Sequence, residues 1–142
     1  MRLALDEAAA AARDCEVPVG AVVTRRGEVL SVARNRMRDT NDPTAHAEMV
    51  AMRAAAETLG DCRLDGCDLW VTLEPCAMCA GAIALARIAR LYFGAADPKG
   101  GAILHGPRLF GQPTCHHAPE IYPGIGESEA GEMLKAFFRQ RR

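Results

Sequence analysis

The sequence predicts an α/β fold, a three-layer α/β/α sandwich around a mixed sheet of about five strands. Short apolar segments typical of strands alternate with longer segments of helical composition. Two strand-like segments are joined by a short turn at Arg26-Gly27, which predicts an antiparallel hairpin among strands that helices otherwise connect. The length of 142 residues, with 49% hydrophobic and 25% charged residues, fits one domain over residues 1–142.

The first elements follow from local composition. Residues 1–14 are rich in alanine and poor in helix breakers, which predicts a helix. Residues 17–24 form a largely apolar run suited to a buried strand. After the Arg26-Gly27 turn, residues 28–33 are expected to form the second strand of the hairpin.

The middle of the chain predicts a helix followed by a strand. Asp42 is expected to cap the helix and Pro43 to take its first position, since proline has no N–H to lose there. The helical composition then runs over residues 44–59. Residues 67–73 form an apolar strand with the β-formers Trp70 and Val71.

The second half predicts three further elements. Pro75 suits the first position of a helix over residues 76–87, and residues 91–95 predict a short strand. The remainder divides into a loop over residues 97–101, a stretch over 102–124 with no assigned element, and a last helix over 127–142.

Two short motifs carry the chemistry. His46-Ala47-Glu48 and Pro75-Cys76-Ala77-Met78-Cys79 together match the H-x-E…P-C-x-x-C signature of zinc-dependent base deaminases. One imidazole and two thiolates give three protein ligands and leave a fourth position for water, as in catalytic rather than structural zinc sites. His46, Cys76 and Cys79 are therefore the predicted zinc ligands.

Glu48 is the predicted general acid and base. It lies two residues past His46, about 200° around an ideal helix of about 3.6 residues per turn, so it is not expected to bind the same metal. A carboxylate beside the activated water is better placed to take its proton and to deliver protons to the ring nitrogen and the departing amine.

Other readings of the cysteines and histidines were weighed. A C-x-x-C motif alone also fits a redox pair or half of a structural zinc site, but the chain has no second C-x-x-C. Cys115-His116-His117 would need a fourth ligand that the sequence does not identify, so a structural loop is favoured there.

The overall charge and hydropathy narrow the expected partners. A net charge of −1 gives no general attraction to nucleic acid, so a polyanionic partner would need a local patch. Arg34, Arg36 and Arg38, and the arginines that close the chain, could supply one. No apolar run reaches membrane-spanning length and no signal peptide precedes the first helix, so a cytoplasmic protein without membrane association is expected.

Over nearly its whole length the chain resembles the bacterial tRNA-specific adenosine deaminases of the cytidine deaminase-like superfamily. The stretches that carry the resemblance are Glu16-Val17-Pro18-Val19-Gly20-Ala21-Val22, Asn35, Asn41-Asp42-Pro43-Thr44-Ala45-His46-Ala47-Glu48, Val71-Thr72-Leu73-Glu74-Pro75-Cys76-Ala77-Met78-Cys79-Ala80-Gly81-Ala82, Phe93-Gly94-Ala95, Asp97-Pro98-Lys99-Gly100-Gly101-Ala102 and Phe137-Phe138-Arg139. The resemblance implies hydrolytic conversion of adenosine to inosine at the wobble position of a tRNA anticodon. It also implies a homodimer with one Zn²⁺ per subunit and no organic cofactor.

The resemblance further implies a set of substrate contacts. Asn35 matches an asparagine that holds the flipped base, although a turn-forming Asn at a strand end explains it too. The base pocket would be lined by Val19, Gly20, Ala21, Ala47 and Pro75. A bulge in an edge strand is another explanation for Gly20.

Four residues are implied to meet RNA outside the base pocket. Asp97 and Lys99 match an RNA-facing loop, although Asp-Pro-Lys-Gly is also a common turn. Phe138 is expected to stack on a base and Arg139 to meet a phosphate. Core packing is the expected use of at least one of Phe137 and Phe138, because an amphipathic helix buries one face.

Two other functions remain open from the sequence. A free-base deaminase acting on guanine or cytosine shares the zinc motif, but Val71-Thr72-Leu73, the loop at Asp97 and the arginine-rich last helix favour the tRNA enzyme. A zinc-stabilised binding module without turnover is the second, and Glu48 opposes it because a structural zinc needs no adjacent acid.

Overall fold

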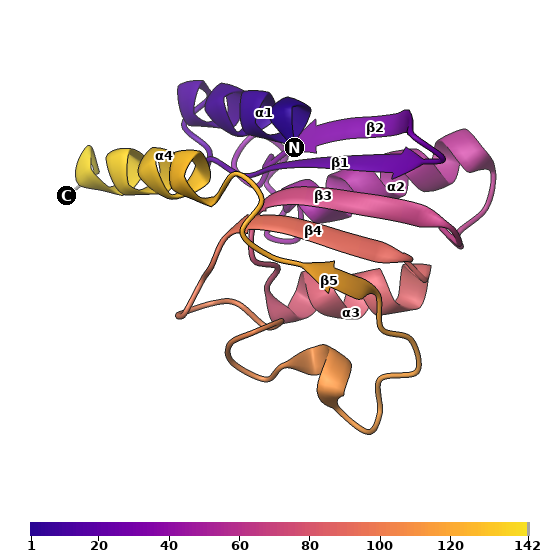
Figure 1. Cartoon of the computed structure of the whole chain (residues 1–142). Helices are drawn as coiled ribbons and strands as arrows, with labels where there is room; N and C mark the ends of the chain where they lie inside the picture. The colour runs from indigo at the N-terminus through magenta and orange to yellow at the C-terminus, as the bar shows by residue number, and fades with distance from the viewer. Residues whose placement is uncertain (142) are drawn as a thin grey trace.

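The computed structural model describes residues 1–141, and Figure 1 shows how its elements are arranged. In chain order these are α1 (Arg2–Arg13), β1 (Gly20–Arg25), β2 (Glu28–Arg34), α2 (Ala47–Leu59), β3 (Cys67–Leu73), α3 (Ala77–Ala86), β4 (Arg90–Ala95), the 3-10 turn η1 (Leu109–Gly111), β5 (Glu120–Tyr122) and α4 (Glu127–Arg139). Arg142, in the predicted last helix, lies outside the described residues.

The five strands form one mixed sheet in the order β2-β1-β3-β4-β5, which confirms the predicted sheet. β1 runs antiparallel to β2 and to β3, whereas β3, β4 and β5 are parallel. The hairpin turn falls at Arg26 and Gly27, whose φ values of 51° and 80° are the positive angles that a tight two-residue hairpin turn needs.

The fifth strand lies within the stretch where the sequence indicated no element. Three residues are too few to show a period, so β5 depends on pairing with β4. Glu120 N–H donates to Ala89 O at 2.9 Å, and the ring of Tyr122 stacks on Tyr92 with centroids 4.7 Å apart. Long-range contacts rather than local propensity therefore create this strand.

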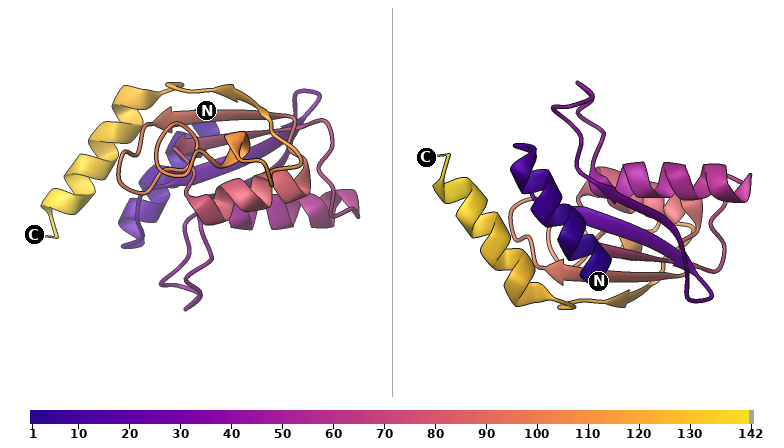
Figure 2. Two further views of the ribbon diagram at one scale, coloured as in Figure 1. Left: turned by 90° about the horizontal axis from the view of Figure 1, so that it is seen from below. Right: turned by 90° about the horizontal axis from the view of Figure 1, so that it is seen from above.

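Helices cover both faces of the sheet, which confirms the three-layer sandwich. α1 and α4 pack on one face, and α2 and α3 pack on the other (Figure 2). The main core lies between the sheet and the second pair, where Leu69, Val71, Leu91 and Phe93 are at most 1% exposed. Side chains of β3 alternate between the two faces of the sheet, so every second one points toward α2 and α3, the helices that begin at the two motifs.

The two motif helices begin later than predicted. α2 starts at Ala47 because Asp42 instead stabilises a turn, where its Oδ1 accepts the Thr44 N–H at 2.8 Å. α3 starts at Ala77. His46 and Cys76 are the N-cap residues, with extended ψ angles of 152° and 174°. The predicted zinc ligands therefore sit at helix starts rather than within helical turns.

β1 starts three residues later than predicted, because Pro18 has no N–H and Val19 N–H bonds back to Val17 O. Gly20, its first residue, lies against α1, and a Cβ there would collide with Ala4 O. β1 is an interior strand, so the explanation of this glycine as an edge-strand bulge is wrong. Glycine is needed because the helix backbone approaches so closely.

In the described part of the chain, no helix has both the length and the apolar character required to cross a membrane.

Candidate metal centre and substrate groove

The structure brings the three predicted zinc ligands together. The ligand atoms of His46, Cys76 and Cys79 lie within 4.8 Å of one another, and they form the one such group found within residues 1–141. Nδ1 of His46 is 3.6 Å from each sulfur atom. The starts of α2 and α3 thus present one imidazole and two thiols to a common point.

These distances fit a zinc ion. Zn–S bonds of about 2.3 Å and Zn–N bonds of about 2.0–2.1 Å, at a tetrahedral angle, separate sulfur from nitrogen by about 3.6 Å. The separations in the structure are 3.6 Å for both thiols. Three protein ligands leave one tetrahedral position free, which is the arrangement of a catalytic zinc site.

Without a metal, the two cysteines share their protons unequally. Hydrogen bonds from Cys79 and His46 lower the pKa of Cys76 to about 4. The same contact with Cys76, together with burial, raises the pKa of Cys79. The hydrogen bond to Cys76 also raises the pKa of His46. Cys76 is therefore the thiol that ionises first, whereas Cys79 must release its proton when a metal binds.

Glu48 lies at the second position of α2 and is only 4% exposed. Burial raises its pKa, because water no longer solvates the carboxylate, although its own backbone N–H and His46 act in the opposite direction. The metal-ligand group does not include it. The structure thus places a buried carboxyl with a raised pKa beside the ligands, as general acid and base catalysis requires.

Asn35 connects the end of β2 to the start of α2. Its Oδ1 accepts the Ala47 N–H at 2.8 Å, and its backbone N–H donates to Val19 O at 3.1 Å. Asn35 is 5% exposed, and no buried side-chain N or O atom of the described chain lacks a partner. Since its Nδ2 makes no hydrogen bond to residues 1–141, this donor must be open to solvent.

The other residues predicted to line the base pocket occupy different places. Pro75 is buried directly before Cys76, and its carbonyl accepts the Ala102 N–H at 2.9 Å. Ala21 is fully buried in the core between β1 and the motif helices. Gly20 faces α1, on the other side of the sheet. Ala47 and Pro75 are thus the chain neighbours of the metal ligands His46 and Cys76, Asn35 bonds to Ala47, and Val19, just before β1, bonds to Asn35.

The four residues predicted to meet RNA line one groove between α4 and the loop after β4. It has a volume of about 780 Å³ and is lined by Val17, Leu73, Ala96, Asp97, Lys99, Leu134, Lys135, Phe138, Arg139 and Arg141. Cations outnumber the single acid, Asp97. Phe138 is 48% exposed in this groove, whereas its neighbour Phe137 is 6% exposed and packs in the interior.

The chain was compared with known proteins. Residues 1–95 match the family model described as the cytidine and deoxycytidylate deaminase zinc-binding region. The chain is 58% identical to the tRNA-specific adenosine deaminase of Agrobacterium fabrum, over all of this chain and 93% of that protein. The chain belongs to the tRNA-specific adenosine deaminase family of zinc-binding deaminases.

Solved structures agree with this membership. A structure from a study of A-to-I editing by tRNA:A34 deaminases at the wobble position of transfer RNA superposes with a TM-score of 0.94 at 58% identity, over 94% of this chain and 97% of that one. The guanine deaminase of Bacillus subtilis superposes less well, with a TM-score of 0.66 at 28% identity over 99% of this chain and 90% of that one. The guanine deaminase thus shares the fold at lower sequence identity.

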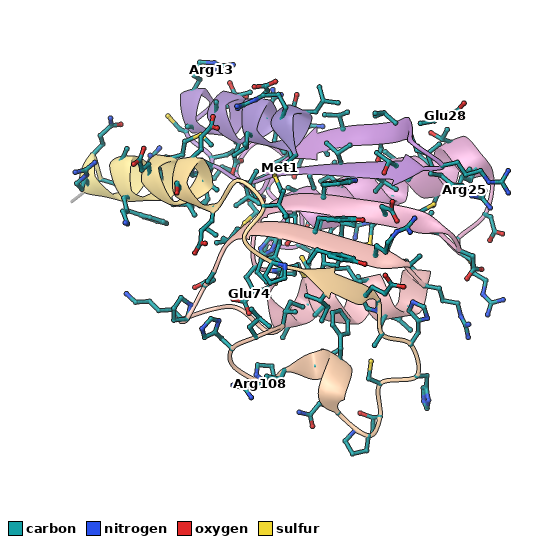
Figure 3. All side chains as sticks on the ribbon, in the orientation of Figure 1. Met1, Arg13, Arg25, Glu28, Glu74 and Arg108 are labelled. Atoms are coloured by element: carbon teal, nitrogen blue, oxygen red, sulfur yellow. The ribbon has the colours of Figure 1, made fainter. Side chains whose placement is uncertain are left out.

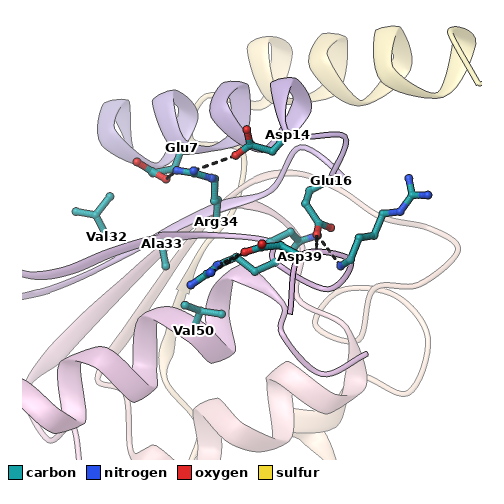
Figure 4. A pocket seen from close by; sticks show the side chains of 11 residues that line it. Glu7, Asp14, Glu16, Val32, Ala33, Arg34, Asp39 and Val50 are labelled. Atoms are coloured by element: carbon teal, nitrogen blue, oxygen red, sulfur yellow. Dashed lines mark hydrogen bonds and ion pairs between the residues drawn. The ribbon is translucent and has the colours of Figure 1, made fainter. Parts of the chain in front are cut away.

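The side chains of the three arginines near Asn35 contact other groups of the chain. Arg34 donates to Glu7 and pairs with Asp14, both at 2.9 Å, in the groove between α1 and β2 (Figure 4). Arg36 pairs with Asp39 at 2.6 Å, and Arg38 points to Cys15 O at 3.4 Å. The arginines around Asn35 are therefore already engaged within the chain.

Sequence reasoning missed Glu74, which is labelled in Figure 3 at the end of β3. Its carboxylate is 2% exposed and accepts five hydrogen bonds from the segment that follows β4. Burial alone would raise the pKa of Glu74, but N–H donors led by Asp97 and the His105 imidazole lower it overall. The signal in the sequence was an acid between an apolar strand and the deaminase motif.

Cys115-His116-His117 behaves as a structural loop in this deaminase. Cys115 Sγ donates to His117 O at 3.1 Å, and His117 Nε2 donates to Ile88 O at 2.7 Å. These contacts tie the loop to the start of β4. Within residues 1–141, these three residues belong to no group of side chains that could hold a metal ion.

Proposed function

We propose that residues 1–142 form one zinc-dependent deaminase domain that converts adenosine to inosine at the wobble position of a tRNA anticodon. The observation that carries the proposal is the tetrahedral spacing of His46, Cys76 and Cys79 beside the buried carboxyl of Glu48. The full-length likeness to tRNA-specific adenosine deaminases supplies the substrate class.

The chemistry is divided between the metal and Glu48. His46, Cys76 and Cys79 would hold the zinc, which supplies the Lewis acidity that activates the attacking water. Glu48 takes a proton from this water while the water oxygen bonds to C6 of adenine. Glu48 then delivers protons to the ring nitrogen and the departing amine. Water is consumed and ammonia leaves, so the reaction needs no organic cofactor.

The base pocket is proposed to form around the start of α2. Asn35 offers its free Nδ2 donor to an acceptor of the base, while Val19, Ala47 and Pro75 enclose the ring from the buried side. Gly20 and Ala21 support this wall through β1. Asn35 can hold a fixed orientation because its oxygen is committed to Ala47 N–H.

The anticodon stem-loop is the proposed partner, bound along the groove beside α4. Lys99 and Arg139 make no ion pair within residues 1–141 and can reach phosphates, and the exposed ring of Phe138 can stack on a base. Asp97 shapes the loop, since its Oδ1 accepts the N–H groups of Lys99 and Gly100. A tRNA substrate also agrees with the expected cytoplasmic location.

We further propose that the enzyme is a homodimer, as the family resemblance implies. Leu85 on α3 is 85% exposed, the most exposed of the large hydrophobic residues, and borders an apolar groove between α2 and α3 that includes Met49, Met52 and Ala82. Light scattering should report twice the subunit mass, and Leu85→Lys should reduce it toward one subunit. A wild-type protein of single-subunit mass would contradict the dimer.

The decisive test is a deamination assay on an anticodon stem-loop with a wobble adenosine. The zinc-loaded protein is assayed beside free guanine, cytosine, adenine, adenosine and cytidine. We expect inosine in the stem-loop and no ammonia from the free bases or nucleosides. Ammonia from guanine or cytosine alone would replace the proposal with a free-base deaminase.

A further inference from the structure

One buried carboxylate joins the segment after β4 to the metal-bearing turn. Oε1 of Glu74 accepts the backbone N–H groups of Ile103, Leu104 and His105 at 3.2, 2.8 and 3.1 Å. Oε2 accepts the Asp97 N–H at 2.9 Å and His105 Nδ1 at 2.7 Å. Glu74 therefore contacts both ends of the segment over residues 97–105, called the 97–105 loop below.

These hydrogen bonds determine the shape of the loop. Four of the five donors are backbone N–H groups, so the carboxylate constrains the main chain and not only side chains. Hydrogen bonds to a charged acceptor are about twice as strong as those between neutral groups. Without the carboxylate, these loop N–H groups would lack partners, which favours another loop conformation.

The same loop pairs with the turn that carries the metal ligands. Gly101 forms an isolated antiparallel bridge with Cys76, and Ala102 N–H donates to Pro75 O at 2.9 Å. A Cβ at Gly101 would lie 2.5 Å from Asp97 O and 2.5 Å from Cδ of Glu74. The loop backbone, the carboxylate and the ligand-bearing turn therefore pack with no room for a side chain.

The other side of the loop forms a wall of the groove beside α4. Asp97 and Lys99 line this groove opposite Phe138 and Arg139. Asp97 Oδ1 accepts the Lys99 N–H at 3.1 Å, and Asp97 N–H itself donates to Glu74. The position of Lys99 thus depends on Glu74 through a short chain of hydrogen bonds.

We propose that Glu74 is a positioning residue that holds the 97–105 loop, and with it Lys99, at a set place relative to the turn of Pro75 and Cys76. Glu74 touches neither the metal nor the base. Its effect is to keep the RNA-facing wall in register with the metal centre, so that RNA binds without first ordering this loop. The inference rests on the proposed function for the identity of the RNA.

The test compares three variants of the zinc-loaded enzyme. Glu74→Gln replaces an acceptor with a donor, and Gly101→Ala forces the loop away from Glu74. Gly111→Ala is the matched control, because it lies in the same β4–β5 connection and its Cβ would meet nothing within 4 Å. Zinc content, hydrogen exchange at residues 97 and 103–105, and the kinetics on the anticodon stem-loop are measured for each.

We expect Glu74→Gln and Gly101→Ala to exchange these amides at least about tenfold faster and to raise KM for the stem-loop about tenfold, since local opening exposes the loop. In Glu74→Gln, one zinc per chain and a kcat within about twofold of wild type should remain, because ligands and acid are untouched. Gly111→Ala should match wild type. Unchanged exchange and KM in a folded, zinc-loaded Glu74→Gln protein would overturn the proposal.

If Glu74→Gln does not fold, His105→Ala tests the positioning role of Glu74 instead. It removes only the Nδ1 donor, and the side chain is 36% exposed. Exchange and KM should then rise about threefold, reflecting the loss of one hydrogen bond, and no change in either would reject the positioning role. If wild type does not deaminate the stem-loop, the proposed function fails by itself, and exchange at residues 97–105 still tests Glu74.

Discussion

Oδ1 of Asn35 accepts the backbone N–H of Ala47 at 2.8 Å, one residue after the metal ligand His46. This contact settles which way the amide faces, because an N–H needs an oxygen opposite it. Nδ2 is then the group that remains for a ligand. A side chain at the end of β2 thereby stabilises the start of α2 and presents a donor to the proposed base pocket.

Substitution of Asn35 should separate these two effects. Asn35→Asp retains an acceptor for Ala47 N–H but removes the donor, so we expect kcat/KM on the stem-loop to fall about tenfold or more, as for loss of one hydrogen bond of about 1–2 kcal/mol. The melting temperature should stay near that of wild type. Asn35→Ala should also lose about 1 kcal/mol of stability, because the hydrogen bond that Oδ1 accepts from Ala47 N–H at the start of α2 is lost. An Asn35→Asp enzyme with wild-type kinetics would exclude a contact from Nδ2 to the base.

Glu48→Gln keeps the shape of a side chain that is 4% exposed but cannot transfer the proton. We expect kcat to fall by about 10²–10⁴, the usual contribution of general acid and base catalysis. Zinc content and circular dichroism should match wild type, because Glu48 is not in the ligand group. Turnover close to wild type in this variant would remove Glu48 from the mechanism.

Zinc affinity should depend on pH in a defined direction. Cys76 has a pKa of about 4 and is already ionised, whereas the pKa values of Cys79 and His46 are raised. Binding must release the proton of Cys79, and that of His46 wherever the imidazole is charged, so affinity should rise with pH, by about tenfold per pH unit for each proton released. Competition with a chromophoric chelator between pH 6 and pH 8 measures this slope. An affinity that does not change over this range would contradict the assigned protonation states.

Phe137 and Phe138 should respond oppositely to truncation. Phe137 is 6% exposed, and Arg141 lies over its ring at 3.6 Å, so Phe137→Ala should cost about 3–5 kcal/mol of stability. Phe138→Ala should change stability by no more than about 0.5 kcal/mol. It should weaken stem-loop binding by about 1–3 kcal/mol if a base stacks there. Urea denaturation and RNA titration distinguish the two, and unchanged RNA affinity in Phe138→Ala would argue against stacking.

Salt dependence should distinguish Arg139 from Arg34. Arg139 lines the groove beside α4, so Arg139→Ala should weaken stem-loop binding and reduce the slope of log K against log salt by about 0.7–0.9. Arg34 is paired with Glu7 and Asp14. Arg34→Ala should leave the slope unchanged and cost about 0–1 kcal/mol of stability. Equal slopes for both variants would show that the RNA does not bind in the groove beside α4.

Local patterns in the sequence predicted the strong elements well. The strand predicted at residues 67–73 has the bounds of β3, because an apolar run with the β-formers Trp70 and Val71 suits a sheet that helices cover on both faces. The starts of α2 and α3 were misplaced because proline is compatible with a turn as well as with a first helical position. β5 could not be found, since its three residues are a strand only through pairing with β4.

The residue types proposed for the chemistry, an imidazole, two thiols and a carboxyl, could be predicted from the sequence, because few other functions require them in this order and spacing. Only the tertiary structure decided how they are used. Nδ1 of His46 reaches 3.6 Å from both thiols because two helix starts meet at one side of the sheet. Folding likewise pairs Arg34 with Glu7 and surrounds the Glu74 carboxylate with hydrogen-bond donors. Their partners are distant in the chain, and only folding brings such groups within hydrogen-bond reach.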